Sequence, residues 1–197
     1  MHTDFNLIIS IFIYYLFSKI LFLCFPGKIK EYPKASYYLA IIHQGYMLPF
    51  LGIRSLLGYE QNYRLMFSST FSYFLIDFLI NKDIWFRDSS FVLHHLVTLL
   101  LVLCTIFVDD SNMFLPTMNL LCMESGSLWI SVTDVYPTNL NYRIRFYSYV
   151  ISRLINLIFI YLLIINSGFL KIYWVIFSTL LYTHNFLIGK RMYKNLR

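Results

Sequence analysis

The chain has 197 residues, of which 58% are hydrophobic and only 13% are charged, about half the charged fraction of an ordinary soluble domain. This composition excludes a water-soluble globular domain, and apolar stretches of about 20 residues, enough to cross a ~30 Å hydrocarbon core, recur along the sequence. The net charge of +6 does not indicate a nucleic-acid partner, because the Lys and Arg residues punctuate loops instead of clustering on one soluble face.

The sequence predicts an all-α fold, a polytopic helical membrane bundle with about seven transmembrane helices. The expected spans are residues 5–25, 36–57, 64–82, 89–108, 112–133, 145–167 and 170–189. Turn-forming or charged residues follow the first, second, fourth and fifth spans: Pro26-Gly27, Gly58, Asp109-Asp110 and Pro137. The first span is long and has no basic residue before it, so we expect a retained helix and not a cleaved signal peptide.

Alternate loops differ strongly in their content of basic residues, and short basic loops are retained in the cytoplasm. One set of loops contains Lys28, Lys30, Lys34, Lys82, Arg87, Arg143, Arg145, Lys190, Arg191, Lys194 and Arg197. The other set contains only Arg54, Arg64 and Lys171. We therefore expect the N-terminus on the lumenal or exterior side and the C-terminus in the cytosol, with Asp109 and Asp110 in a lumenal turn.

The cysteines and three loop charges are expected to have no chemical role. Cys24, Cys104 and Cys122 lie in or beside apolar runs without C-x-x-C spacing, which indicates neither a disulfide framework nor a zinc site. We interpret the three cysteines as buried packing residues. Three charged residues around the loop after the fifth span are expected to be solvated: Asp134, Arg143 and Arg145.

His, Asp, Glu or Arg side chains occur well inside six of the seven expected spans. They are His43, Asp77, His94, His95, Glu124, Arg153 and His184. With a rise of 1.5 Å per residue, the predicted topology places all of them about 7 to 15 Å from the cytosolic ends of their helices. Burying such a group costs several kcal/mol unless it is paired or hydrated. The sequence therefore predicts a polar cavity, shared by these helices and open toward the cytosol.

Helical periodicity aligns the polar residues into stripes. The stripe of the fourth span contains Ser90, His94, Thr98 and Thr105, whereas His95 is rotated by about 100° and can contact a different partner. The fifth span carries Thr117, Glu124, Ser127 and Ser131, and the sixth carries Tyr149, Arg153 and Asn156. We expect these three helices to present their polar faces to one another.

Structural explanations compete with functional ones for the same residues. Ser, Thr, His and Asn side chains commonly join membrane helices by hydrogen bonds worth about 1 kcal/mol or less, and His43 or His184 alone can serve that purpose. Arg153 can neutralise Asp77 or Glu124, or it can bind an anionic head group or phosphate. Five histidines are too few for a membrane di-iron site and their spacing does not favour haem, so no metal or cofactor is expected.

The string RDSSFVLHHLVT, residues 87–98, resembles the His-His-x-x-Thr signature of TLC-domain proteins, the family of ceramide synthases and their relatives. Three more segments are similar to that family: SYYLAIIHQG around His43, SYFLIDFLI around Asp77, and SRLINLIF around Arg153. The resemblance divides the chain into an N-terminal helix and cytosolic loop, 1–35, a TLC-like domain, 36–190, and a basic cytosolic tail, 191–197.

The resemblance implies a six-helix core around a cytosol-facing cavity in the endoplasmic reticulum membrane. It also implies transfer of an acyl chain from acyl-coenzyme A, as co-substrate, to the amine of a sphingoid base. His94 or His95 would then be the nucleophile or general base, and Asp77 or His43 would fix the imidazole tautomer. Thr98, Glu124, Arg153 and His184 would support binding. Imidazole titrates near neutrality and can accept an acyl group or a proton, so the chemistry is consistent with the residues.

The sequence departs from ceramide synthases in one respect. The Asp-x-x-Asp pair that follows their His-His helix is replaced here by MNLLCMESGSLW, which offers only Glu124. Asp77 and Glu124 resemble instead the TLC-domain branch linked to membrane lipid composition. Two alternatives therefore stay open: a non-catalytic, lipid-binding regulator of membrane composition, and an accessory protein for cargo or translocation in the endoplasmic reticulum. The expected partners are membrane lipids, with a homo-oligomer also open.

Overall fold

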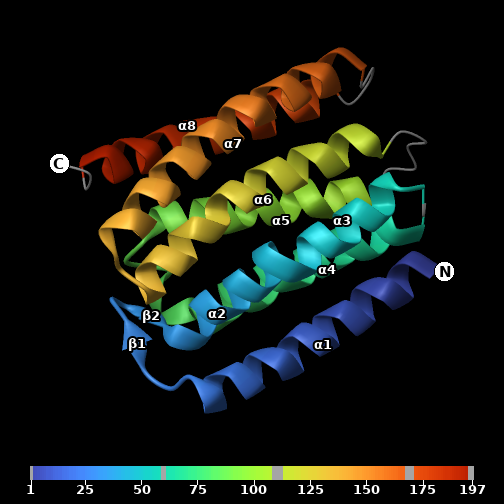
Figure 1. The fold of residues 1–197 in the computed structure, drawn as a ribbon. Coiled ribbons are helices and arrows are strands. Elements are labelled where there is room, and N and C mark those ends of the chain that lie inside the picture. The colour runs from blue at the N-terminus through green and yellow to red at the C-terminus, as the bar shows by residue number, and fades with distance from the viewer. Residues whose placement is uncertain (1, 59–60, 108–112, 167–170, 195–197) are drawn as a thin grey trace. The chain divides into compact units, whose positions relative to one another are not determined.

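The computed structural model describes residues 2–58, 61–107, 113–166 and 171–194, most of which are helical (Figure 1). The chain forms two compact units, which we call the N-terminal unit (Met1–Asp110) and the C-terminal unit (Ser111–Arg197). The predicted all-α class is confirmed, with one short β-hairpin as the only strand structure within the described residues.

The N-terminal unit contains four long helical rods within the described residues, counting α2 and α3 as one. Its elements are α1 (His2–Cys24), β1 (Lys28–Ile29), β2 (Tyr32–Pro33), α2 (Lys34–Ile42), α3 (Leu48–Leu56), α4 (Gln61–Ile80) and α5 (Ser89–Phe107). A π-helical turn, His43–Met47, joins α2 to α3, and the Leu48 amide donates to the His43 carbonyl five residues earlier. Pro49 at the start of α3 has no amide hydrogen, which disfavours regular α-helical bonding through this turn.

The ends of these helices follow the predicted turn residues. Gly27 has a φ of +94° and Gly58 a φ of +91°, a left-handed conformation that glycine adopts without a steric penalty. Gly27 turns the chain from α1 into the β1–β2 hairpin, and Gly58 follows the last residues of α3. The predicted breaks at these two positions are confirmed.

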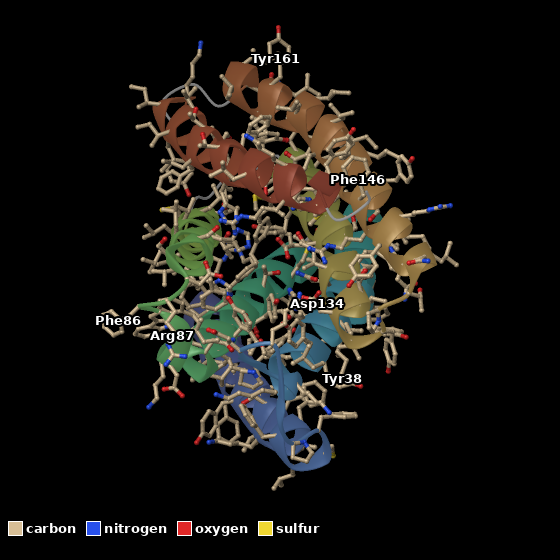
Figure 2. The ribbon with its side chains drawn as sticks, turned by 90° about the vertical axis from the view of Figure 1, so that its left-hand side faces the viewer. Tyr38, Phe86, Arg87, Asp134, Phe146 and Tyr161 are labelled. Carbon is tan, nitrogen blue, oxygen red and sulfur yellow. The ribbon has the colours of Figure 1, made fainter. Side chains whose placement is uncertain are left out.

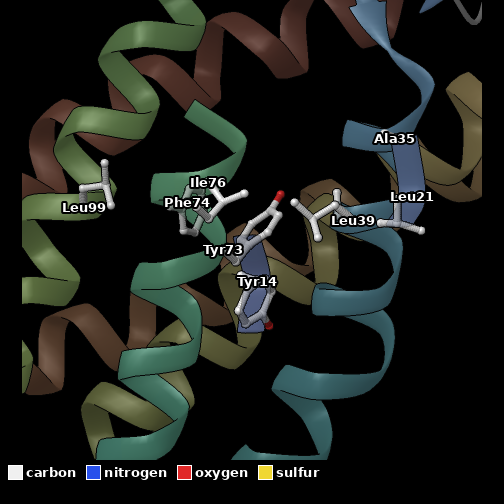
Figure 3. Packing of buried hydrophobic residues seen from close by; sticks show 9 residues of the cluster. Tyr14, Leu21, Ala35, Leu39, Tyr73, Phe74, Ile76 and Leu99 are labelled. Carbon is white, nitrogen blue, oxygen red and sulfur yellow. The ribbon is translucent and has the colours of Figure 1, made fainter. Parts of the chain in front are cut away.

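Helix α4 is central in the packing of the N-terminal unit. It contacts α1, α2, α3 and α5 (Figure 1). Helix α1 also contacts α2. The buried cluster around α4 draws residues from four helices (Figure 3): Tyr14, Leu21, Ala35, Leu39, Ala40, Tyr73, Phe74, Ile76 and Leu99. Helix α1, which the resemblance sets outside the TLC-like domain, is therefore packed into this unit.

The C-terminal unit consists of α6 (Phe114–Val135), α7 (Asn139–Asn166) and α8 (Lys171–Lys194), with α7 packed on both other helices. Thr138 begins α7, because its Oγ1 accepts a hydrogen bond from the Asn141 amide at 3.1 Å. Helix α8 continues to Lys194, so the first four residues of the predicted tail are helical. Residues 195–197 lie outside the described residues, as do Asp109 and Asp110.

Four helices are long and apolar enough to cross a membrane: Phe5–Cys24, Ser89–Ile106, Asn139–Asn166 and Lys171–Tyr193. Large apolar side chains on these helices and beside them point outward, as Figure 2 shows for Tyr161 and for Phe86 in the bend before α5. These helices indicate a membrane protein. Helices α2–α3, α4 and α6 overlap the remaining three predicted spans. Both α4 and α6 contain several buried polar residues. The seven-span topology stays a prediction.

The structure corrects two predictions about individual residues. Cys24 and Cys104 are exposed and Cys122 is partly exposed, so the interpretation of all three as buried packing residues is wrong. Asp134 and Arg145 are not solvated loop charges: they lie on α6 and α7, their charged atoms are 3.4 Å apart, and their side chains are 9% and 14% exposed. They pair because α7 begins only four residues after α6 ends. Arg143 is exposed, as predicted.

Candidate functional site

A stripe of four buried residues runs along α4 in the N-terminal unit. It consists of Ser69, Tyr73 and Asp77 on α4 and of Asn81, which directly follows the last residue of α4. The four residues are spaced by four, so they lie on one side of the helix, and each is at most 5% exposed. Each residue of this α4 stripe contacts a polar or aromatic side chain from another element. The stripe is the scaffold on which the predicted His43, Asp77 and His95 are held.

Asp77 and His95 form a buried pair in the middle of this scaffold. His95 Nε2 and Asp77 Oδ2 are 2.9 Å apart, and both residues are 5% exposed. The other carboxylate oxygen accepts hydrogen bonds from Ser36 Oγ on α2 and from Asn81 Nδ2, the latter at 3.1 Å. Both oxygens of the predicted catalytic carboxylate are therefore engaged, and the cluster joins α2, α4 and α5.

The hydrogen bonds of His95 define where its protons lie. Its Nδ1 is 3.0 Å from the carbonyl oxygen of Phe91, which can only accept, so Nδ1 carries a proton. Its Nε2 faces a carboxyl oxygen, and two lone pairs would repel unless a proton lies between them. Either His95 is an imidazolium beside the Asp77 carboxylate, or a protonated Asp77 donates to a neutral imidazole. In both cases the pair has no net charge and shares one proton.

Aromatic rings surround the His95 imidazole. The ring centroids of Phe91, Phe74 and Phe78 lie 3.9, 5.4 and 6.0 Å from that of His95. Aromatic faces attract cations, and the rings also exclude water from the shared proton. The surroundings are suited to a histidine that stays paired in a low-dielectric interior.

Asp88 fixes the start of α5 and thereby the position of both histidines. Its Oδ1 accepts a hydrogen bond from the Phe91 amide at 3.0 Å, a side-chain cap of the helix. Its Oδ2 accepts from the Tyr32 hydroxyl at 2.8 Å, which ties the β-hairpin to the helix start. Burial raises the pKa of Tyr32, and the hydrogen bond to Asp88 raises it further. Asp88 is thus a structural part of the RDSS segment.

His94 has a different environment from His95, as the helical offset predicts. Its ring is half-buried, with edge contacts to Phe74 and His95 at centroid distances of 5.7 and 5.5 Å. Thr98, one turn further along α5, is 4% exposed. Thr98 and Thr105 are buried and Ser90 is half-buried, so the predicted stripe of the fourth span faces mainly inward.

His43 lies at the π-helical turn and is completely buried. Its Nδ1 is 2.6 Å from the Tyr14 hydroxyl, which is 2.9 Å from Ser69 Oγ. The ring stacks on Tyr73 with centroids 4.3 Å apart and an angle of 15° between the planes. The early histidine is thereby held by α1 and α4 together.

In the C-terminal unit, Arg153 is 7% exposed and bonded to neutral groups. It donates to the Met123 carbonyl, to Ser152 Oγ at 3.1 Å and to Ser127 Oγ at 2.8 Å, and its guanidinium lies 4.3 Å from the Tyr149 ring centre. Whether Arg153 neutralises Asp77 or Glu124, or binds an anionic group, stays a prediction.

A polar network joins the three helices of the C-terminal unit. Asn156 on α7 donates to Asn119 Oδ1 at 2.7 Å and accepts from the Tyr182 hydroxyl at 3.1 Å. Tyr149 donates to Asn185 Oδ1 at 2.8 Å. Glu124 and His184 are also buried, at 2% and 5% exposure. The predicted polar faces of the fifth and sixth spans thus face each other.

The structure places the predicted site residues in two groups. The N-terminal unit contains His43, Asp77, His94, His95 and Thr98, and the C-terminal unit contains Glu124, Arg153 and His184. A single cavity shared by both groups stays a prediction. Within the described residues, no three His, Cys, Asp or Glu side chains gather as metal ligands would.

Sequence reasoning missed the residues that hold the predicted ones. They are Tyr14, Ser36, Ser69, Tyr73 and Asn81. The four-residue spacing of Ser69, Tyr73, Asp77 and Asn81 was a usable signal, because that spacing marks one helix face. Nothing in the local sequence marks Tyr14, one of several tyrosines and phenylalanines in the first span.

Comparisons of the chain with protein-family models, with curated proteins and with solved structures gave no match.

Proposed function

We propose that the protein is a TLC-type membrane protein of lipid metabolism that transfers an acyl chain from acyl-coenzyme A to the amine of a long-chain base. The proposal rests on the arrangement of Asp77, His94 and His95 in the N-terminal unit. It includes a six-helix TLC-like core, residence in the endoplasmic reticulum, a lumenal N-terminus and a cytosolic C-terminus. These parts follow from the resemblance and from the distribution of basic loops.

The observation that supports this function is the division of roles between the two histidines. Both nitrogens of His95 are engaged, with Phe91 and Asp77, whereas His94 is only half-buried beside it. Because His94 is the more exposed of the two rings, it is the one assigned to contact substrate. Asp77 holds the ring of His95, and the ring of His94 packs against it. His95 and Asp77 are therefore positioning residues.

The reaction needs one base that moves one proton. The amine of the long-chain base attacks the thioester carbonyl, so that a carbon–nitrogen bond forms and the carbon–sulfur bond breaks. His94 takes the proton that the amine loses and returns it to the leaving thiolate. The products are an amide and free coenzyme A thiol, with no redox change and no cofactor. An apolar helical bundle lets both fatty chains remain in hydrocarbon during this step.

The test is amide formation by the purified protein with long-chain acyl-coenzyme A and a long-chain base. Loss of a general base costs about 10²- to 10⁴-fold in rate, so His94→Ala should lower kcat by at least about a hundredfold. Thr179→Ala, at an exposed position on α8, is the matched control and should keep the wild-type rate. Unchanged amide formation by His94→Ala would contradict the mechanism.

A second candidate is a non-catalytic lipid-binding regulator. The observation that favours it is that Ser36, Asp77, Asn81 and His95 form hydrogen bonds with one another. This cluster holds its helices together without a substrate. In that case lipid should co-purify with the protein, as seen by native mass spectrometry, and no amide should form. His94→Ala should then change the amount of bound lipid.

A further inference from the structure

The hydrogen bonds around His43 form a chain of three residues from three elements. The Tyr14 hydroxyl lies between His43 Nδ1, at 2.6 Å, and Ser69 Oγ, at 2.9 Å. All three residues are at most 6% exposed. Tyr14 belongs to α1, a helix that the sequence resemblance leaves outside the TLC-like domain. The chain therefore links the additional helix to a predicted site residue.

The direction of this chain follows from the chemistry of its members. A phenol is a better donor than an alcohol, and an imidazole nitrogen is a better acceptor than a hydroxyl oxygen. Tyr14 therefore donates to His43 Nδ1, and Ser69 donates to the Tyr14 oxygen. A neutral imidazole that accepts at Nδ1 carries its proton on Nε2. His43 is thus set as an Nε2–H donor.

That donor has no hydrogen-bond partner among the described residues, although His43 is 0% exposed. An unsatisfied buried donor costs about 1 to 3 kcal/mol, so its presence calls for an explanation, such as a bound ligand. The stacked Tyr73 ring fixes the plane of the imidazole. The residue also opens a π-helical turn, a feature that is frequent at functional sites.

We propose that His43 donates its Nε2–H to the carbonyl oxygen of a fatty acyl group, with Tyr14 and Ser69 as the positioning residues that fix its tautomer. A neutral donor inside an apolar bundle suits a neutral acceptor, since an anion would be buried without a countercharge. The ligand must also reach the donor through apolar surroundings, which a carbonyl on a hydrocarbon chain does. The acceptor is the thioester of acyl-coenzyme A or the amide of a ceramide.

This inference deepens the proposed acyl transfer, because the same donor would stabilise the oxygen that becomes negative when the amine attacks. A continuous series of ring contacts connects His43 to His94. His43 stacks on Tyr73, Tyr73 contacts Phe74 at 4.8 Å, and Phe74 contacts His94 at 5.7 Å. Donor and base therefore belong to one packed cluster of the N-terminal unit.

The experiment uses the full chain in lipid nanodiscs with two probes, long-chain acyl-coenzyme A and ceramide, each labelled with carbon-13 at the carbonyl. In the wild type, the bound carbonyl should show an infrared stretch at lower wavenumber than the free one. His43→Leu should abolish this shift, and Tyr14→Phe should reduce it. His43→Gln keeps an N–H near the Nε2 position and should restore it in part. Nitrogen NMR of the wild-type imidazole should show the Nε2–H tautomer, which Tyr14→Phe should destabilise.

Tyr15→Phe is the matched control, because Tyr15 is 48% exposed and its hydroxyl is not part of the chain. In the transfer assay, loss of one such donor should lower kcat about a hundredfold in His43→Leu, whereas Tyr15→Phe should keep the wild-type rate.

Two results would overturn the inference: no carbonyl shift with either probe in the wild type, or a shift that survives His43→Leu. An inactive wild type that still shifts the ceramide carbonyl through His43 would contradict acyl transfer and support this inference. An active wild type whose kcat is unchanged in His43→Leu would support acyl transfer and contradict a role of His43 in it.

Discussion

His94 and His95 are neighbours in sequence but differ in what holds them. Asp77 and Phe91 engage both nitrogens of His95, whereas His94 packs by its edge on Phe74 and on the His95 ring. Consecutive residues on a helix point about 100° apart, so only one of two adjacent histidines can meet the α4 stripe. This division makes separate predictions for the stability and the activity of the two variants.

Replacing His95 by Ala should destabilise the protein far more than replacing His94. The substitution leaves the Asp77 carboxyl buried without its main partner, and breaking a buried pair costs about 3 to 5 kcal/mol. His94 is only half-buried, and its printed ring contacts are with Phe74 and His95, so His94→Ala should cost less. Unfolding of the two variants in mixed micelles measures the difference. Equal losses of stability would show that the Asp77–His95 pair does not have this role.

Tyr32 predicts a dependence of stability on alkaline pH. Its folded-state pKa is raised by burial and by Asp88, so the folded protein holds this proton more tightly than the unfolded chain, whose tyrosines titrate near pH 10. The contribution is complete below about pH 10 and is lost as the pH rises toward the folded-state value. Between about pH 9 and about pH 11, Tyr32→Phe should therefore lose less stability than the wild type. Parallel losses in both proteins would contradict this.

At the scale of elements, the α6–α7 contact depends on one glycine. A Cβ built on Gly126 would lie 1.8 Å from Ser152 Oγ and 2.7 Å from Ser152 Cβ, so the two helices approach too closely for a side chain. Small residues permit such close approach between membrane helices. The close approach brings Arg153 within reach of the Met123 carbonyl and Ser127.

Gly126→Ala should therefore destabilise the C-terminal unit by about 1 to 3 kcal/mol, the usual cost of overpacking. Gly189→Ala is the control, because a Cβ there meets nothing within 4 Å and alanine favours the helix. Adding Ser152→Gly to Gly126→Ala should recover part of the loss. Thermal unfolding of the three variants tests this, and a neutral Gly126→Ala would refute the close contact.

At the scale of the whole molecule, the number of membrane crossings determines the sides on which the ends lie. Seven spans place the N- and C-termini on opposite sides, whereas crossing by only the four most apolar helices would place them on the same side. We expect a glycosylation acceptor added at the N-terminus to be modified and one at the C-terminus to stay unmodified. Modification of both or of neither would contradict the seven-span prediction.

The helices themselves could be predicted well from the sequence. The spans expected around α1, α5 and α7 overlap the observed helices, and Gly27 and Gly58 end elements where expected, because hydrophobic length and glycine conformation are local properties. The roles of Asp134 and Arg145 were predicted wrongly, because their pairing depends on the tight α6–α7 turn and not on local charge.

The candidate site was only partly predictable. His43, Asp77 and His95 stand out because a polar residue in an apolar span is costly, which composition alone reveals. Their supports, such as Tyr14 and Ser36, do not stand out, because a tyrosine or serine in a membrane helix is common and its role depends on the partner it meets.

The sequence by itself determined the class of the protein, the positions of its helices and the residues that chemistry must account for, since hydrophobicity and helical period act within each segment. Only the tertiary structure decided that Asp77 pairs with His95 and not His94, and that α1 supplies a hydrogen bond to His43. These contacts join residues 18 and 29 positions apart in the chain. Their formation depends on how α4 packs against its neighbours, which no local pattern encodes.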